Sequence, residues 1–482
     1  MTTSILPLVP VLVLLSSMSS HGHAGHGGDE KREHYMVVET SSLLEPTAIC
    51  SGLKVMPSSN GTWVPLHRPY GPCSPATSIT GTPSLAEMLH WDQLHTDAIR
   101  KKATAGGEDV LEPDTPIVDV QQTDYRPIAS FGIGTGRGRS GSSTISPTAI
   151  DDPILAQTMS IDTSIDLPWI QCLPCPIPEC YPQQNAFFDP STSRTSAAVP
   201  CRSAACAALG RYGAGCSNKQ CQYFIDYGDG RATSGTYMTD TLTLNPSTVI
   251  MNFRFGCSHA VRGDFSGQTS GTMSLGGGRQ SLLSQTAATF GNAFSYCVPQ
   301  PSSSGFLSLG GPANAGPGPA SFSRTPLVRN PNIIPTLYVV RLRGIEVGGR
   351  RLNVPPIVFS GGSVMDSSVI ITQLPPTAYR ALRLAFRNAM RAYPRVAGKA
   401  GLDTCYDFVR FTNVTVPAVS LVFEGGAVVR LDPMAVMIEG CLAFVPTPRD
   451  FALGFIGNVQ QQTHEVLYDV GGGSVGFRRG AC

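Results

Sequence analysis

Two short segments of the chain resemble each other, and each carries an aspartate that could do chemistry. One reads Met-Ser-Ile-Asp-Thr-Ser around Asp162, and the other reads Ser-Val-Met-Asp-Ser-Ser around Asp366. If a duplicated β lobe brought both residues to one cleft, the pair would hold a single proton, because two adjacent carboxylates cannot both ionise. The ionised aspartate could then take a proton from a water while its protonated partner donates to a substrate carbonyl. The repeat therefore points to general acid–base hydrolysis of a peptide bond without a covalent intermediate.

The repeat alone leaves a second interpretation open. A six-residue match of this kind also arises by chance, and aspartates at strand ends often only hydrogen bond a turn. Catalysis and a purely structural role both remain possible at this point.

The elements around these aspartates are predicted to be mostly strands. From about Tyr125 onward, short alternating or apolar runs are separated by Gly, Pro, Ser and Asn, which is the pattern of an all-β chain. One helix is predicted from Pro375 to about Tyr393. A second helical period runs from Pro83 to Lys102, within a more polar stretch that reads as a pro-region or a small N-terminal module.

Composition excludes several classes of protein. The 482 residues carry a net charge of +1, 14% charged and 41% hydrophobic residues, 51 Gly and 39 Pro. A disordered chain would be more charged, and a nucleic-acid binder would be basic. A long helical bundle would not tolerate this much Gly and Pro. We expect a β-rich globular protein with no cofactor, no bound metal and no nucleic-acid partner.

The N-terminus indicates entry into the secretory pathway. Ile5 to Leu15 form an apolar run that is too short to span a bilayer and suits the core of a signal peptide, which we place at residues 1–24. A transit peptide would be richer in arginine. No later stretch is long and apolar enough for a membrane span, so we expect an extracellular or vacuolar protein.

Fourteen cysteines in such a chain indicate disulfides. Cys172 and Cys175 could instead form a redox or zinc pair, but their neighbours look like a stapled loop region. Two cysteines, Cys50 and Cys73, lie in the N-terminal part. The disulfide candidates beyond it are Cys172, Cys175, Cys180, Cys201, Cys206, Cys216, Cys221, Cys257, Cys297, Cys405, Cys441 and Cys482.

Two further patterns have simple interpretations. The histidines at 21, 23 and 26 resemble a metal tract, but they lie at or before the cleavage region and are interpreted as a solvated or removed segment. Asn60 and Asn413 begin glycosylation sequons, which are frequent by chance.

Ordered segments along nearly the whole chain resemble the nepenthesin-type group of plant pepsin-like aspartic proteases. Residues 455–477, which read FIGNVQQQTHEVLYDVGGGSVGF, are among the most specific. The other matching segments are residues 64–75, 162–175, 222–230, 294–297, 337–347 and 365–379.

The resemblance implies an all-β, bilobal pepsin-like fold with a cleft between two pseudo-repeated β lobes and a few short helices. It implies catalytic roles for Asp162 and Asp366, an aspartic endopeptidase activity, and synthesis as a zymogen. The implied division is a pro-region at 25–118, an N-terminal lobe with a Cys-rich insert and a flap at 119–305, and a C-terminal lobe at 306–482. Peptides or proteins would be the substrates of a monomer.

The resemblance also assigns supporting roles. Thr163 and Ser367 match hydroxyl residues that brace the two loops against each other. Tyr227 matches the tyrosine of the flap, which closes over bound peptide, and Trp169 would support it from beneath. Lobe proximity in this family suggests disulfides between Cys405 and Cys441 and between Cys297 and Cys482.

The active-site loops depart from the family pattern. Ser164 and Ser368 replace both loop glycines, which crowds the site with a Cβ and a hydroxyl. Ile165 and Val369 replace hydroxyl residues that donate to the outer oxygen of each aspartate. Their loss is expected to raise the pKa of the carboxylates and loosen their orientation, although Ser164 and Ser368 could donate from a different angle.

Two departures lie outside these loops. Gly136 stands where the family has proline, and the Arg-, Gly- and Ser-rich stretch at 136–152 looks like an insertion or a mispredicted exon boundary. Arg231 replaces the usual serine of the flap. These changes leave two functions open: an active endopeptidase, or a weak or inactive relative that keeps the cleft for binding, as plant inhibitors of fungal xylanases do.

Overall fold

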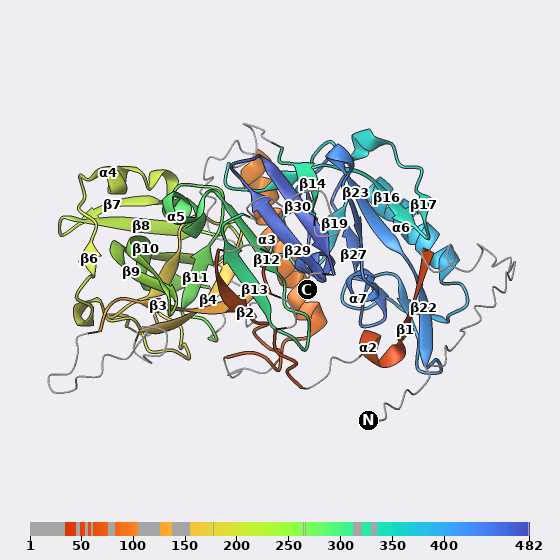
Figure 1. Cartoon of the computed structure of the whole chain (residues 1–482), viewed down its shortest axis with the longest axis horizontal. Helices are drawn as coiled ribbons and strands as arrows, with labels where there is room; N and C mark the ends of the chain where they lie inside the picture. The colour runs from red at the N-terminus through yellow and green to blue at the C-terminus, as the bar shows by residue number, and fades with distance from the viewer. Residues whose placement is uncertain are drawn as a thin grey trace, which may run out of the picture.

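Strands are the main regular secondary structure of the described residues beyond 126 in the computed structural model of the protein, which confirms the expected all-β fold. Two β lobes lie side by side, with the N-terminal part of the chain between them and along the second lobe (Figure 1). The structure describes residues 34–44, 49–53, 56–58, 61–75, 82–104, 126–136, 155–176, 178–263, 265, 267–311, 321–328, 335–480 and 482.

The first lobe is built on a nine-stranded sheet in the order β10-β5-β11-β4-β3-β9-β8-β7, with β6 paired to β9. Its strands are β3 (Ile128–Ile133), β4 (Ala156–Asp162), β5 (Trp169–Gln171), β6 (Ala197–Ala198), β7 (Gly213–Ser217), β8 (Gln220–Asp226), β9 (Ala232–Asn245), β10 (Thr248–Arg262) and β11 (Gly271–Ser274).

The second lobe contains a five-stranded sheet in the order β15-β18-β28-β19-β27 and two four-stranded sheets, β17-β16-β23-β24 and β20-β21-β26-β25. The strands of the five-stranded sheet are β15 (Val339–Val340), β18 (Ser363–Met365), β19 (Thr372–Leu374), β27 (Phe444–Pro446) and β28 (Gly454–Ile456). The others are β16 (Leu342–Val347), β17 (Arg350–Arg351), β20 (Arg395–Val396), β21 (Cys405–Tyr406), β23 (Val419–Phe423), β24 (Val428–Arg430), β25 (Met437–Ile438) and β26 (Cys441–Leu442).

The duplication expected from the repeated aspartate segments is present in the strand pairing. In the first lobe, β4 pairs parallel with β11, β11 antiparallel with β5, and β5 parallel with β10. In the second lobe, β18 pairs parallel with β28, β28 antiparallel with β19, and β19 parallel with β27. Asp162 ends β4 and Asp366 directly follows β18, so the two aspartates occupy equivalent places in the two copies.

A six-stranded sheet in the order β14-β30-β29-β12-β13-β2 joins the parts of the molecule. Its two edge strands, β14 and β2, come from distant parts of the chain. Its strands are β2 (Thr62–Leu66), β12 (Ala293–Cys297), β13 (Gly305–Leu309), β14 (Ser323–Pro326), β29 (His464–Asp469) and β30 (Ser474–Arg479).

Helices are few and mostly short. The two helices predicted from periodicity are present as α3 (Leu85–Thr104) and α6 (Pro376–Ala389). The others are α2 (Thr40–Leu44), α4 (Ala204–Ala207), α5 (Leu282–Phe290), α7 (Pro433–Val436) and α8 (Asn458–Gln461), with 3₁₀ turns η1 (Pro190–Thr192), η2 (Gly210–Tyr212), η3 (Pro356–Phe359) and η4 (Glu424–Gly426). In the part of the chain that the structure describes, no helix is long and apolar enough to cross a membrane.

A capping box starts α3. The Ser84 amide and hydroxyl donate to Glu87 Oε2 at 2.8 and 2.7 Å, and the Glu87 amide donates back to the Ser84 hydroxyl at 3.3 Å. This exchange satisfies backbone groups that a helix start otherwise leaves unpaired. Lys101 and Lys102 in the last turn complement the helix dipole.

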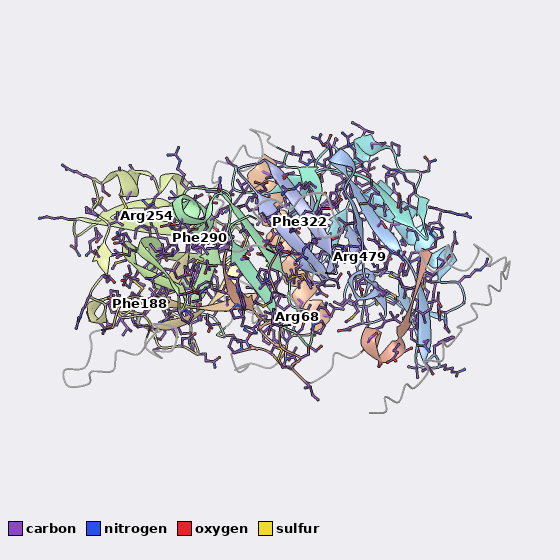
Figure 2. All side chains as sticks on the ribbon, viewed as in Figure 1. Arg68, Phe188, Arg254, Phe290, Phe322 and Arg479 are labelled. Atoms are coloured by element: carbon purple, nitrogen blue, oxygen red, sulfur yellow. A yellow bond between two sulfur atoms is a disulfide. The ribbon has the colours of Figure 1, made fainter. Side chains whose placement is uncertain are left out.

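The N-terminal part of the chain docks on the core at three places. Strand β1 (Tyr35–Glu39) pairs antiparallel with β22 (Asn413–Pro417), and β2 pairs antiparallel with β13. Helix α3, drawn in orange, lies between the two lobes (Figure 1). Side chains fill both lobes throughout, and Phe188, fully buried in the first lobe, is one example (Figure 2).

Candidate active site

The two aspartate loops meet at the junction of the lobes and are joined by reciprocal hydrogen bonds. The Thr163 amide donates to Ser367 Oγ at 3.3 Å, and the Ser367 amide donates to Thr163 Oγ1 at 3.0 Å. The Ser367 hydroxyl also donates to the Ile161 carbonyl at 3.2 Å. Both side chains are buried. Bonds of this kind fix the position of one loop relative to the other.

Asp162 is completely buried, and both of its carboxylate oxygens accept hydrogen bonds. Oδ1 accepts from the Ser164 amide and from the Ser164 hydroxyl, each at 2.7 Å. Oδ2 accepts from Arg126 Nη1 at 2.8 Å. The expected donor at Ser164 is therefore in place, and Arg126 adds a buried charge that the sequence did not suggest.

Asp366 is equally buried but less well supported. Its Oδ1 accepts from the Ser368 amide at 2.7 Å, which matches the bond in the first loop. Among the described residues, Oδ2 has no hydrogen-bond partner, and neither has the Ser368 hydroxyl. Ser368 therefore does not provide the replacement donor that its sequence position allowed. His95 Nε2 lies 3.7 Å from Asp366 Oδ2.

The expected rise in the pKa of the carboxylates is wrong for Asp162. Burial acts to raise its pKa, but the charge of Arg126, with smaller contributions from His95 and Ser164, outweighs burial and lowers the pKa below its ordinary value. The missing hydroxyl at Ile165 is thus offset by a cation that lies just before β3.

Tyr227 lies in the turn between β8 and β9, and its side chain contacts other residues of the first lobe. Trp169 Nε1 donates to the Tyr227 hydroxyl at 2.9 Å, and Phe265 packs edge-on against both rings. Arg231, the unusual flap residue, forms an ion pair with the buried Asp229 at 2.7 Å and lies over the Tyr227 ring. The flap turn is therefore more strongly tied down than a serine at position 231 would allow.

Helix α3 covers the two aspartates. His95 reaches both sides of the cleft, with Nε2 3.7 Å from Asp366 Oδ2 and Nδ1 3.9 Å from Asp229 Oδ2. Burial opposes the charged imidazole, but the carboxylates of Asp366, Asp162 and Asp229 outweigh it and raise the pKa of His95. A protonated His95 is therefore the natural partner for this group of acids.

Further contacts fix α3 to each lobe. Asp92 accepts from the amides of Ile370 and Ile371 in the second lobe, at 2.8 and 3.1 Å, and burial raises its pKa to about 7. Arg100 Nε donates to the Leu453 carbonyl at 2.9 Å. On the flap side, Lys102 Nζ donates to the Asp226 carbonyl at 2.5 Å.

The flap and α3 are in close contact. A Cβ at Gly228, in the flap turn, would lie 3.2 Å from the Ala98 Cβ of α3. A cavity of about 50 Å³ remains between the helix, the first loop and the flap, lined by residues that include His95, Ser164 and Tyr227. This volume holds little more than water, so a peptide cannot enter while α3 stays in place.

Several residues that position the site were not identified from the sequence. In the second lobe, Gln461 Nε2 donates to the Asp366 carbonyl and Asn458 Nδ2 to the Ser367 carbonyl, each at 3.1 Å. Both lie in the GNVQQQ stretch, whose sequence resembles the family but indicates no role for either side chain. In the first lobe, Asp166 accepts from the Gly278 amide at 2.8 Å. Burial raises the pKa of Asp166 to about 6 against the opposing charge of Arg211.

Every cysteine is disulfide-bonded, and Cys172 and Cys175 each bond another cysteine, so they do not form a redox or zinc pair. Cys405 bonds Cys441 and Cys297 bonds Cys482, as the resemblance suggested. The remaining bonds join Cys50 to Cys73, Cys172 to Cys257, Cys175 to Cys180, Cys201 to Cys216 and Cys206 to Cys221. Within the described ranges, no group of His, Cys, Asp and Glu could hold a metal ion. The predicted signal peptide, the histidine patch and nearly all of the 136–152 stretch lie outside these ranges.

The fold and the two aspartate loops define a pepsin-like protein, and comparison with known proteins agrees. Family models described as "Xylanase inhibitor N-terminal" and "Xylanase inhibitor C-terminal" match residues 146–311 and 337–479. An aspartyl protease family protein of Arabidopsis thaliana is 34% identical over 95% of each chain. Aspartic proteinase nepenthesin-2 of Nepenthes gracilis is 33% identical over 73% of this chain and 81% of its own.

The chain belongs to the plant aspartyl protease family. The solved structure titled "Crystal structure of edgp" has the same fold, with a TM-score of 0.57 and 18% identity over 74% of this chain and 92% of the other.

Proposed function

We propose that the protein is an aspartic endopeptidase made as a zymogen, in which Asp162 and Asp366 are the catalytic pair. The observation that carries the proposal is the reciprocal bonding of Thr163 and Ser367, which holds two equivalent aspartate loops together at the lobe junction. A structural role for each aspartate alone would not require the two loops to be joined in this way.

Hydrolysis would proceed through a water held between the carboxylates once α3 has left. One aspartate is ionised and takes a proton from the water as the water oxygen attacks the peptide carbonyl carbon. The other, protonated, gives its proton to the carbonyl oxygen. Collapse of the tetrahedral intermediate then breaks the C–N bond, and a proton passes to the leaving amine. Tyr227, held by Trp169, would close over the peptide.

The inhibitory element of the zymogen would be α3. Its contacts to the second lobe through Asp92 and to the flap through Lys102 close the cleft from both sides. His95 neutralises the carboxylates that a substrate would approach. We further propose that residues 1–24 direct the chain into the secretory pathway and that residues 25–118 are removed on activation.

The test is cleavage of an unfolded protein by the full chain, which is first acidified toward pH 3 to release α3 and is then assayed at roughly pH 3–5, where such a carboxylate pair holds one proton. We expect cleavage that a peptide analogue with a tetrahedral hydroxyl-bearing carbon blocks, and that Asp162→Ala and Asp366→Asn abolish. Asp240→Asn is the matched control, because Asp240 is a buried carboxylate of the first lobe with its own hydroxyl partners. Cleavage that survives Asp366→Asn would exclude the pair as the catalyst.

A second candidate function is a binding or inhibitory protein that keeps the cleft without hydrolysis. Asp366 Oδ2 favours it, since this oxygen has no hydrogen bond among the described residues. The matching family models also carry the name of xylanase inhibitors. Absence of cleavage in the wild-type chain, with recovery when Ser164→Gly, Ile165→Ser, Ser368→Gly and Val369→Thr are combined, would support this function.

A further inference from the structure

The position opposite each aspartate differs between the two copies of the fold. In the first lobe β3 pairs antiparallel with β4, with Ile128 opposite Ser160, and the Ile161 amide donates to the Pro127 carbonyl at 2.8 Å. Continuing this register by two residues places Arg126 opposite Asp162. The Arg126 side chain fills that place, with Nη1 2.8 Å from Asp162 Oδ2.

The second lobe repeats the arrangement with an apolar residue. Strand β15 pairs antiparallel with β18, with Val339 opposite Val364, and the Met365 amide donates to the Tyr338 carbonyl at 2.8 Å. The same continuation places Leu337, which is buried, opposite Asp366. Leu337 cannot donate a hydrogen bond, and Asp366 Oδ2 has no hydrogen-bond partner in the described chain.

The two carboxylates are therefore supported unequally from equivalent positions. Both receive the same amide bond, from Ser164 and from Ser368, at 2.7 Å. Only Asp162 receives a guanidinium on its second oxygen, in a pair whose side chains are 4% and 0% exposed. An ion pair removed from water in this way favours the ionised carboxylate strongly.

We infer that Arg126 is a positioning residue that replaces the hydroxyl missing at Ile165 as the donor to the outer oxygen of Asp162. It thereby fixes Asp162 as the ionised member of the pair. The catalytic role that follows rests on the hydrolysis proposed above. In that reaction, Asp162 is the base that accepts the proton of the water. Asp366 is left as the member that donates to the carbonyl oxygen.

The charged and titratable groups around Asp162 come from five elements. The effect of each group on the ionisation of Asp162 must be distinguished from the effect of Arg126. They are Arg126 before β3, His95 of α3, Asp166 of the same loop, Tyr227 of the flap turn and Asp366 of the second loop. His95 is the only other cation among them, so a His95→Gln background removes its contribution.

The experiment follows the ionisation of the Asp162 carboxyl in the full chain by carbon NMR of labelled aspartate, assigned by the signal lost in Asp162→Asn. We expect Arg126→Leu, which copies the second lobe, to raise the midpoint by about 1 to 3 pH units, the effect of a neighbouring guanidinium. Adding Ile165→Ser should lower the midpoint again. The control is Arg478→Leu, which breaks another buried ion pair, with Glu465, and should leave the midpoint unchanged.

An unchanged midpoint in Arg126→Leu, or no effect of Ile165→Ser in that background, would overturn the inference. Arg126→Gln gives the same comparison with a polar side chain if the leucine variant does not fold. Peptide cleavage is measured separately, and the kcat of Arg126→Leu should fall at least tenfold while KM changes little. If the wild-type chain cleaves nothing but the NMR shifts are as expected, Arg126 keeps its role and the proposed proteolysis fails.

Discussion

Thr163 and Ser367 exchange hydrogen bonds across the lobe junction although 204 residues separate them in the chain. Each amide donates to the hydroxyl oxygen of the other residue, so neither hydroxyl can be lost without leaving a buried amide unpaired. These two hydrogen bonds therefore connect the two copies of the fold and act together.

We expect Thr163→Val and Ser367→Ala each to lower the free energy of unfolding by about 1–3 kcal/mol, the cost of an unsatisfied buried group. The double variant should lose less than the sum, since both changes break the same bonds. Thermal unfolding of the four proteins measures this. Thr286→Val, which removes a buried hydroxyl bond within α5, serves as the control. Strict additivity of the two loop changes would contradict the coupling of Thr163 and Ser367.

The docking of α3 should depend on pH through His95. Because its pKa is raised in the docked state, His95 contributes stability that is fully present below about pH 6.5, the free value, and is lost as pH rises through the docked value. Asp229 acts in the opposite sense. Arg231 and the other partners outweigh burial and lower its pKa, so its contribution is present above pH 3.8 and is lost as pH falls through the lowered value.

Hydrogen exchange of the α3 amides between pH 4 and 9 should therefore show the strongest protection in mildly acidic solution. In His95→Gln the protection below pH 6.5 should fall toward the level seen at pH 9. His90→Gln, on the exposed side of the same helix, should behave as wild type. Equal protection of wild type and His95→Gln at pH 5 would contradict the role of His95.

The capping box of α3 should control how tightly the cleft is closed. Ser84→Ala removes one of its partners, and we expect a loss of about 1 kcal/mol in helix stability. Faster hydrogen exchange over residues 85–92 than in wild type would show it. The matched change is Ser203→Ala, which removes the cap of α4 on the surface of the first lobe and should leave α3 unaffected.

The ion pair of Arg231 and Asp229 should stabilise the flap only as a pair. Arg231→Met leaves the buried Asp229 carboxylate without its cation, which we expect to cost about 3–5 kcal/mol, whereas adding Asp229→Asn should restore most of the loss. Thermal unfolding measures both. Arg324→Met breaks a more exposed pair with Asp469 and should cost less than about 1 kcal/mol. A double variant as unstable as Arg231→Met would contradict this account.

Much of the site was predictable because the family pattern fixes it locally. The two aspartate loops, the partners Thr163 and Ser367, and the pair of Tyr227 and Trp169 all lie within short segments whose sequence is distinctive. The duplicated strand pairing followed from one repeat of six residues.

Arg126 could not be found in the same way. It lies 36 residues before Asp162, and only the antiparallel register of β3 and β4 brings the two side chains together. The stretch between these strands departs from the family spacing, which hid that register. His95 was missed for a related reason, since a histidine on an amphipathic helix has no sequence signal that says which acid it will meet.

The attachment of the N-terminal segment determines what a single cut would achieve. Its disulfide, Cys50–Cys73, is internal, so no covalent bond among the described residues ties residues 34–104 to the lobes except the chain itself. A cut between Thr104 and Arg126 would leave the segment bound through β1, β2 and α3. In the proposed zymogen, inhibition would then change from an intramolecular contact to a complex of two chains, and its strength would depend on concentration.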